Sequence, residues 1–364
     1  MAIRLNEEHQ TTGSGLGYQM SSYVFMRSLA NKTGFKYAID PQNLYALKNT
    51  FDGLVIDEED APGVQGKHSV EFMIDDSFDD VLKTVKDNTT LYGYPTPSNA
   101  IDITQIEEVK SHFKFRDEIE SRCKSWKESV VGDSEVIAIH LRRGDFVDDY
   151  SGMFLIDDDY YLKALKLLPK DIPVLIFTND KEYVRSNENF SGDRFILVDD
   201  IVNFNQPTSD LSREIDINVD KSGDNLFNYS VVLESMGNPE LDDYLQNKIG
   251  NRLYNYSHDM CLMSMCDYHV IANSTFSLWA VELSNTKRVV YPMYWSQGLS
   301  DDIDAVLCDN PESCRPGFRC NQDTTIARDL GGFDQTASAL GYFMKDDWIG
   351  LENPDQRAKK WGCC

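Results

Sequence analysis

VIAIHLRRGD, residues 136–145, is an apolar run that ends in a cluster of charged side chains and a glycine. The apolar part has the composition of a strand that is buried on both faces. Such a strand delivers His140, Arg142 and Arg143 to its carboxyl end, and Gly144 permits a sharp turn directly after them. The segment therefore predicts a core strand followed by a turn that concentrates positive charge.

Short apolar segments alternate with amphipathic ones along most of the rest of the chain. The segments that we expect to form strands are Ala2–Leu5, Phe35–Ile39, Val136–Leu141, Pro173–Thr178, Arg194–Val198, Tyr268–Ala272 and Arg288–Tyr291. The segments that we expect to form helices are Gln19–Asn31, Ile103–Trp126, Asp159–Leu168, Tyr244–Met265 and Thr275–Ser284. Residues 50–100, with scattered Gly and Pro, are interpreted as irregular. Strands that alternate with helices predict parallel sheets and the α/β class.

The chain has 364 residues, which suits roughly two domains at about 150 residues each. A helical connection near residues 103–130 separates two blocks of strand–helix units. We therefore expect two facing, Rossmann-like, doubly wound domains over residues 1–130 and 131–300, with a C-terminal insertion and tail over 301–364. In such sheets, ligands bind at the carboxyl ends of the strands.

The composition excludes several classes of function. Lys and Arg total 35 against 60 Asp and Glu, for a formal charge of −25. A surface this acidic repels nucleic acid and anionic membranes, so we expect neither as a general partner. The apolar runs are far shorter than the ~20 residues that span a bilayer. The opening residues do not resemble a secretory signal, and we expect a protein that is cytoplasmic or peripheral to a membrane.

Two adjacent arginines at the end of a strand are costly unless an anion meets them. Guanidinium groups bind phosphate oxygens in a bidentate manner, so Arg142 and Arg143 favour an anion site. The structural alternative is an Arg–Asp ion pair that only closes the loop.

Five segments of the chain, in the family's order, resemble those of the α-1,2-fucosyltransferases, glycosyltransferase family 11, and of the related α-1,6- and protein O-fucosyltransferases. His140–Asp145 resembles the first motif of that family. Gly15–Met20 resembles its glycine-rich opening turn, with Tyr18 where that turn usually carries Asn. The segments that resemble later motifs are Tyr160–Ala164, Phe177–Asp180 and Asp259–Trp279. The resemblance covers roughly residues 13–295, and residues 301–342 have no counterpart.

The resemblance implies a GT-B fold, GDP-L-fucose as the donor and a glycan as the acceptor, with a galactoside and an α-1,2 linkage expected. It also implies that no metal takes part. The donor site would lie in the second domain, with the first domain on the acceptor side.

Carried over residue by residue, the resemblance assigns Arg142 and Arg143 to the diphosphate, and His140 to the guanine or the phosphate edge. Asp180 becomes a candidate for the guanine amino and ring N–H groups. The structural alternatives are that Asp180 is only a turn residue and that Ser274 is only a helix N-cap. The residues that open a helix with phosphate-binding backbone N–H groups are Ser274, Thr275 and Phe276.

The implied chemistry is a single inverting displacement. Positive charge at Arg142, Arg143 and the helix terminus would stabilise the departing diphosphate. A carboxylate near the acceptor would serve as general base, and Asp145, Asp148 and Asp149 all follow the first motif. Asp145 and Asp149 are the candidates retained with Arg142, although Asp145 is also placed to orient Arg142.

Other patterns in the sequence resemble metal-binding sites or sites of covalent modification. Asp157-Asp158-Asp159 matches the metal-binding Asp-x-Asp of other glycosyltransferases, but it precedes a helix, and helix capping explains it better. The spacing His258, Cys261, Cys266 and His269 superficially resembles a zinc set, but it spans a helix and a strand. The role of Cys308, Cys314 and Cys320 stays open, as does modification of Cys363 and Cys364.

Two alternatives to a GDP-fucose-dependent transferase remain. One is a related glycosyltransferase with another donor or linkage. The other is a glycan- or nucleotide-binding protein of the same fold that has lost catalysis, which Tyr18 and the altered N-terminal turn motivate.

Overall fold

The structure, a computed structural model, describes residues 2–6, 15–39, 45–60, 64–72, 77–93, 95, 105–147, 155–198, 251–293 and 348–351. The chain divides into two compact units, each treated by itself below. One unit is Met1–Val130 with Asp200–Leu262, and the other is Val131–Asp199 with Met263–Cys364.

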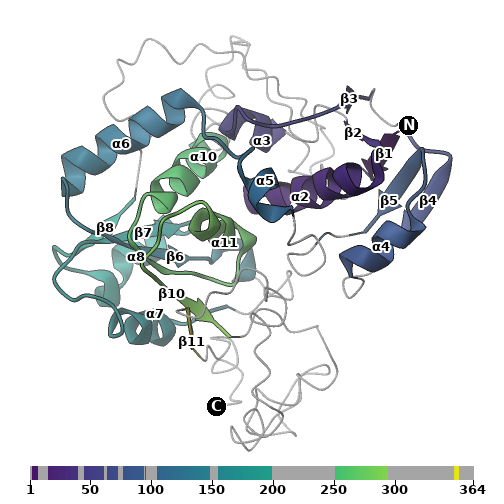
Figure 1. Cartoon of the computed structure of the whole chain (residues 1–364). Helices are drawn as coiled ribbons and strands as arrows, with labels where there is room; N and C mark the ends of the chain where they lie inside the picture. Colours follow the sequence, from purple (N-terminus) through teal and green to yellow (C-terminus); the bar gives the residue numbers. More distant parts are fainter. Residues whose placement is uncertain are drawn as a thin grey trace, which may run out of the picture. The chain divides into compact units, whose positions relative to one another are not determined.

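The first unit contains a five-stranded parallel sheet in the order β3-β2-β1-β5-β4 (Figure 1). Its strands are β1 (Ala2–Leu5), β2 (Lys36–Ile39), β3 (Glu58–Glu59), β4 (His68–Glu71) and β5 (Thr89–Tyr92). Its helices are α2 (Leu16–Thr33), α3 (Tyr45–Thr50), α4 (Phe78–Thr84), α5 (Ile106–Lys110), α6 (Asp117–Val131) and α10 (Asn251–Ser264), the last two running to the unit boundary.

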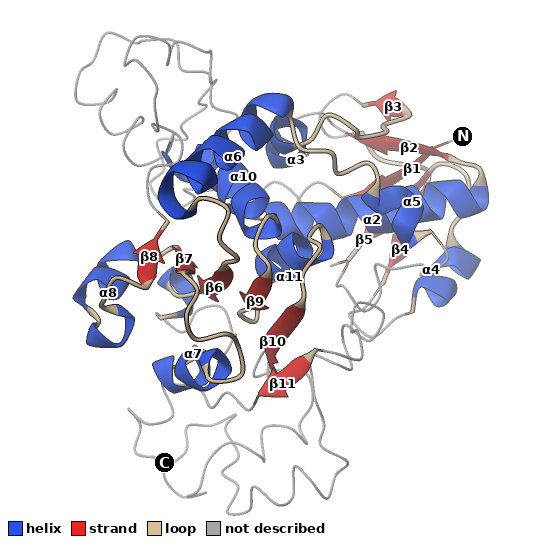
Figure 2. Ribbon diagram, turned by 60° about the vertical axis from the view of Figure 1, so that its left-hand side comes forward, coloured by secondary structure: helices blue, strands red, loops and turns tan. Residues whose placement is uncertain are grey.

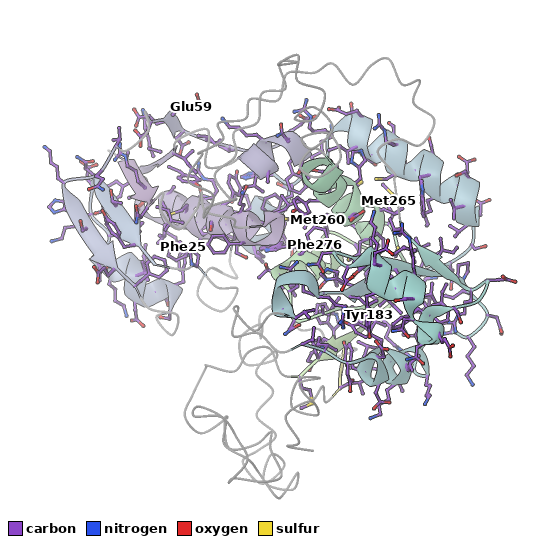
Figure 3. The ribbon with its side chains drawn as sticks, turned by 180° about the vertical axis from the view of Figure 1, so that it is seen from behind. Phe25, Glu59, Tyr183, Met260, Met265 and Phe276 are labelled. Carbon is purple, nitrogen blue, oxygen red and sulfur yellow. The ribbon has the colours of Figure 1, made fainter. Side chains whose placement is uncertain are left out.

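Helix α2 is the centre of the first core. Every residue from Met20 to Ala30 is buried, so this helix is enclosed by its neighbours on all sides. Phe25, labelled in Figure 3, lies 5.0 Å from Phe72 and 6.0 Å from Phe78 between ring centroids. These contacts join α2 to the end of β4 and the start of α4.

Two expectations for the first unit are wrong. Residues 50–100 are not irregular throughout, because they contain β3, β4, α4 and β5. The single helix expected over Ile103–Trp126 is two helices, α5 and α6. Between them, Phe113 and Phe115 lie 5.1 and 5.0 Å from the ring of Phe51, and Phe115 forms an antiparallel bridge with Phe51. Packing of these aromatic rings against Phe51 outweighs the helical periodicity.

The second unit contains a six-stranded parallel sheet in the order β11-β10-β9-β6-β7-β8 (Figure 2). Its strands are β6 (Ile137–Leu141), β7 (Val174–Thr178), β8 (Phe195–Leu197), β9 (Tyr268–Val270), β10 (Arg288–Pro292) and β11 (Ile349–Leu351). Its helices are α7 (Asp158–Leu165), α8 (Lys181–Ser186) and α11 (Thr275–Glu282), with short 3₁₀ turns η2 (Gly144–Phe146) and η3 (Glu188–Phe190).

This second sheet is doubly wound. The chain builds outward from β6 through β7 to β8, then returns to the other side of β6 and builds outward again through β9, β10 and β11. The order therefore reverses between β6 and β9, and ligands of such sheets bind where the order reverses. The predicted α/β class with parallel sheets is confirmed.

The core of the second unit fixes which side chains of β6 face which helices. Ile137, Ile139 and Leu141 belong to one buried cluster with residues of α7 and α8. Successive residues of a strand point to opposite faces, so Ala138 and His140 face the other side of the sheet. All five residues of β6 are buried, as the apolar composition predicts.

Helix α10 contributes to the first unit although it comes late in the chain. Its Ser257 hydroxyl lies 2.6 Å from the Thr50 hydroxyl, and its His258 carbonyl accepts a bond from Cys123 Sγ at 3.3 Å.

Among the described residues, no helix has the length and apolar character needed to cross a membrane.

Candidate active site

Three motif segments follow the carboxyl ends of adjacent strands in the second unit. His140 is paired with Phe177 in the register of β6 and β7, and β9 lies on the other side of β6. The segments after these strands are 142–144, 179–180 and 271–274. Because the strands are parallel, all three segments lie at the same edge of the sheet.

His140 is a buried, neutral side chain at the point where the strand order reverses. Its imidazole centroid lies 5.5 Å from the ring of Phe276, in the first turn of α11. Burial, assisted by the charge of Arg142, lowers the pKa of His140 to about 3. Its Nδ1 has no hydrogen-bond partner among the described residues. A neutral ring with an unsatisfied nitrogen in a buried place is suited to hydrogen bonding with a ligand.

The two arginines occupy different environments. Arg142 is half-buried, and its guanidinium carbon lies 4.9 Å from the centroid of the Phe146 ring. Arg143 is buried, and its Nε donates to Asp180 Oδ2 at 3.3 Å. The guanidinium carbon of Arg143 lies only 3.4 Å from the centroid of the Tyr183 ring. The ion pair that the sequence offered as a structural alternative therefore exists, but for Arg143 and with Asp180.

The turn after Arg143 requires a glycine. Gly144 has φ +55°, and a Cβ there would lie 2.3 Å from Asn179 Nδ2. The same Asn179 side chain accepts a hydrogen bond from the backbone N–H of Arg143 at 2.8 Å. The loops after β6 and β7 are thus joined by an amide that leaves no room for a side chain at position 144.

Asp180 and Ser274 are both helix N-caps, which the structural alternative predicts for Ser274, whereas for Asp180 it predicts a turn residue. Asp180 Oδ1 accepts from the backbone N–H of Tyr183 at 3.1 Å, while its other oxygen pairs with Arg143. Ser274 Oγ accepts from the backbone N–H of Phe276 at 3.3 Å. Thr275 and Phe276 open α11, so the positive end of that helix lies at the candidate site.

The predicted general bases are only partly within the described residues. Asp145 lies in η2, directly after Gly144, and its side chain is outside the description. Asp148 and Asp149 lie outside the described residues, as do residues 301–342 and the cysteines at 308, 314, 320, 363 and 364.

The three aspartates at the start of α7, Asp157–Asp159, have separate partners within the protein. Asp157 Oδ1 caps α7 by accepting from the backbone N–H of Tyr160 at 3.2 Å. Asp158 Oδ1 accepts from the Tyr183 hydroxyl at 2.6 Å. Asp159 forms an ion pair with Lys163 at 2.6 Å. These contacts agree with the capping interpretation of this segment.

The zinc interpretation, which the sequence does not favour, finds no support at His269. Both ring nitrogens of this buried histidine have hydrogen bonds, Nδ1 with Thr286 Oγ1 at 2.9 Å and Nε2 with the carbonyl of Met263 at 2.8 Å. In the part of the chain that the structure describes, no group of three or more His, Cys, Asp or Glu has the arrangement of a metal site.

The sequence profile of glycosyl transferase family 11 matches residues 16–210, more than half of the chain. The chain belongs to this family. The resemblance drawn from the motifs is confirmed, and so is the prediction of a glycosyltransferase-type enzyme at the level of the family.

One curated relative of this family 11 chain is the O-antigen biosynthesis glycosyltransferase WbnK of Escherichia coli. It is 25% identical over 227 residues, which are 59% of this chain and 57% of WbnK. The match therefore spans less than two thirds of that relative's length.

Solved structures with similarity to the chain include three fucosyltransferases. NodZ alpha-1,6-fucosyltransferase soaked with GDP-fucose is 13% identical, with a TM-score of 0.44, over 78% of this chain and 92% of NodZ. A variant of Arabidopsis thaliana FUT1 in complex with GDP is 13% identical, with a TM-score of 0.42, over 79% and 69% of the two chains. POFUT1 in complex with GDP is 8% identical, with a TM-score of 0.39, over 78% and 94%.

Sequence reasoning missed Tyr183 and Asn179 as parts of this family 11 site. Asn179 lies inside Phe177–Asp180, a segment that resembles a family motif, but its bond to Arg143 depends on β6 and β7 being neighbours. Tyr183 lies three residues after Asp180, one turn into α8. The sequence offered one signal for Tyr183 as a site residue. It is an aromatic residue in the first turn of a helix that follows a motif strand.

Proposed function

We propose that the chain is an inverting fucosyltransferase that moves L-fucose from GDP-β-L-fucose to a hydroxyl of a glycan. One observation supports this proposal above the others. Arg142, the neutral His140 and the N-terminus of α11 lie at adjacent strand ends, where the order of the second sheet reverses. Membership of family 11, with its motifs in order, supports fucose as the transferred sugar.

The diphosphate of the donor would be bound by Arg142 and the first turn of α11. A guanidinium binds phosphate oxygens through charge-assisted hydrogen bonds, and a helix N-terminus supplies backbone N–H groups and a partial positive charge. Thr275 and Phe276 carry those N–H groups, with Ser274 holding the cap. Together they offset two phosphate charges in a protein whose net charge is −25.

His140 and Phe276 would contact the nucleotide beside the diphosphate. The low pKa of His140 keeps its ring neutral near pH 7, so Nδ1 or Nε2 can donate or accept according to the tautomer. Asp180 was expected at the guanine, but both of its carboxylate oxygens already have partners. We assign it to the support of Arg143 instead.

The proposed reaction is one displacement at the anomeric carbon of fucose. An acceptor oxygen forms a bond to that carbon while the bond from the carbon to the β-phosphate oxygen breaks. The acceptor proton passes to a carboxylate, for which Asp145 and Asp149 are the candidates, and GDP leaves with the bonding electron pair. Arg142 and α11 stabilise the charge that grows on the diphosphate.

We further propose a GT-B arrangement, with the first unit on the acceptor side and a galactoside acceptor in α-1,2 linkage. Because Arg142 and α11 supply positive charge, no metal is required in this mechanism.

Calorimetric titration with GDP, GDP-fucose and a UDP-sugar, with EDTA present, tests the donor. We expect guanine-selective binding that Arg142→Ala weakens on the order of 10- to 100-fold. Arg288→Ala is the matched control, because Arg288 begins β10 and so lies at the opposite edge of the same sheet. Failure of every guanine nucleotide to bind would overturn the donor assignment.

Turnover is tested separately by release of GDP from GDP-fucose in the presence of galactosides. We expect release with EDTA present and none when Asp145→Asn and Asp149→Asn are combined. Guanine-selective binding without turnover on any acceptor would favour a binding protein of the same fold.

A further inference from the structure

The pleat of β6 separates the two arginines onto different faces of the sheet. Leu141 faces α7 and α8, whereas His140 lies beside Phe276 of α11. Continuing this alternation past the end of the strand places Arg142 with His140 and Arg143 with α8. The contact of Arg143 with Tyr183 of α8 agrees with that placement.

Arg143 is held on three sides by groups of its own unit. Its Nε pairs with Asp180, its guanidinium plane lies against the Tyr183 ring, and its backbone N–H donates to Asn179. Stacking on an aromatic face and a carboxylate partner together stabilise a buried guanidinium. The charge of Arg143 is thus already balanced by neighbours on the α8 side.

The Tyr183 ring is itself fixed from behind. Its hydroxyl donates to Asp158 Oδ1 at 2.6 Å, at the start of α7. The second oxygen of Asp158 accepts from Asn187 Nδ2 at 2.7 Å and from Asn189 Nδ2 at 3.0 Å. Figure 3 labels Tyr183 among the side chains of this unit. Asp158 therefore ties α7, α8 and η3 together behind the ring on which Arg143 lies.

We propose that Arg143, Tyr183 and Asp158 are positioning residues that hold the turn at 142–144 so that Arg142 faces the diphosphate. Arg143 is then a support and not a phosphate ligand, which revises the expectation from the motif. This inference rests on the proposed function, because it assigns a task within the donor site. A displacement of about 1 Å at a binding group is enough to cost about 100-fold in rate.

A double-mutant cycle separates support from direct contact. GDP affinity is measured for the unsubstituted chain, Arg142→Ala, Arg143→Ala and the double variant, with guanosine as the ligand that lacks phosphates. We expect Arg143→Ala to weaken GDP on the order of 10-fold and guanosine hardly at all. In the Arg142→Ala background, the second substitution should cause little further loss, because a support has nothing left to position.

Variants of Tyr183 distinguish a positioning role from a general loss of folding. Tyr183→Phe keeps the ring and loses the bond to Asp158, so we expect a smaller loss of GDP affinity than for Tyr183→Leu. Lowered kcat for GDP-fucose turnover should accompany the Leu variant, with guanosine affinity unchanged. Circular dichroism and the thermal midpoint confirm that each variant is folded.

Tyr268→Leu is the matched control. Tyr268 also donates its hydroxyl to a carboxylate, that of Glu135 at 3.1 Å, and also lies near a cation, Lys287 at 5.8 Å. It begins β9, so it lies at the opposite edge of the sheet from the candidate site. We expect its GDP affinity to equal that of the unsubstituted chain.

The outcomes are distinguishable. Losses that add in the double variant, with GDP binding intact in the unsubstituted chain, would overturn only the support role and make Arg143 a phosphate ligand. Equal losses of GDP and guanosine in Tyr183→Leu would make Tyr183 a purely structural residue. Absence of GDP binding by the unsubstituted chain would overturn the proposed function and this inference with it.

Discussion

Burial keeps two histidines neutral in the folded second unit. The pKa of His140 is lowered to about 3 and that of His269 to about 4, in both cases chiefly by burial. The unfolded chain titrates near pH 6.5, so between these values the unfolded state binds more protons than the folded state. The stability that neutral histidines contribute is therefore complete above about pH 6.5 and is lost as the pH falls.

We expect the free energy of unfolding to fall by up to about 1.4 kcal/mol per pH unit for each of these histidines as the pH drops from 6.5 toward 4. Urea unfolding at several pH values measures this slope. His269→Gln should flatten it, and His68→Gln, at an exposed position of β4, should leave it unchanged. A His269→Gln slope identical to that of the unsubstituted chain would contradict the assignment.

Gly144 combines backbone strain with a close contact, and the two effects can be measured apart. Gly132 has a similar positive φ, +62°, but a Cβ there would meet nothing within 4 Å. We expect Gly132→Ala to cost about 1 kcal/mol of stability through strain alone. Gly144→Ala should cost more, because its methyl group would displace Asn179, and it should also weaken GDP binding. Thermal unfolding and calorimetry give both quantities, and equal costs with unchanged GDP affinity would refute this view.

At the scale of elements, the cap of α11 has a counterpart in the other unit. Ser77 Oγ caps α4 by accepting from the backbone N–H of Asp80 at 3.2 Å, much as Ser274 caps α11. We expect Ser77→Ala and Ser274→Ala each to cost about 1 kcal/mol. Only Ser274→Ala should also lower the affinity for GDP. If both substitutions left that affinity unchanged, the phosphate role of α11 would be wrong.

The elements that the sequence predicted well are those with strong apolar patterns. β6, β7 and β10 are buried runs, and their expected bounds differ by a residue or so from the structure. β3 and β4 were missed because they are short and carry exposed, charged residues at the edges of the first sheet. The break between α5 and α6 depends on Phe51, far away in the sequence, so local periodicity could not indicate it.

The placement of the candidate residues was predictable where they lie within one motif. His140, Arg142 and the cap at Ser274 follow from strand ends and residue types. The partnership of Arg143 with Tyr183 and Asp158 requires knowledge of which helices cover which face of the sheet, and a single sequence does not contain it. The motif therefore indicated two equivalent arginines where the structure distinguishes them.

At the scale of the whole molecule, a net charge of −25 repels an incoming nucleotide diphosphate. This repulsion reaches farther from the protein than the local attraction of Arg142. Salt weakens it, because the screening length is about 10 Å at 0.1 M ionic strength. We expect the association rate constant of GDP to rise as NaCl is raised from about 50 to about 300 mM, because salt screens the repulsion. Stopped-flow fluorescence measures it. A rate that falls with salt would show that the local positive field governs the approach.

The placement of α10 has a consequence for genetic recombination. In chain order this helix comes after β8 and before β9 of the second sheet, yet its Ser257 and His258 bond with the first unit. Each unit is thus encoded by two separate segments of the gene, which alternate with the two segments that encode the other unit. Recombination that exchanges one uninterrupted segment therefore cannot transfer a whole unit without also transferring part of the other, so neither unit can be exchanged alone in a single step.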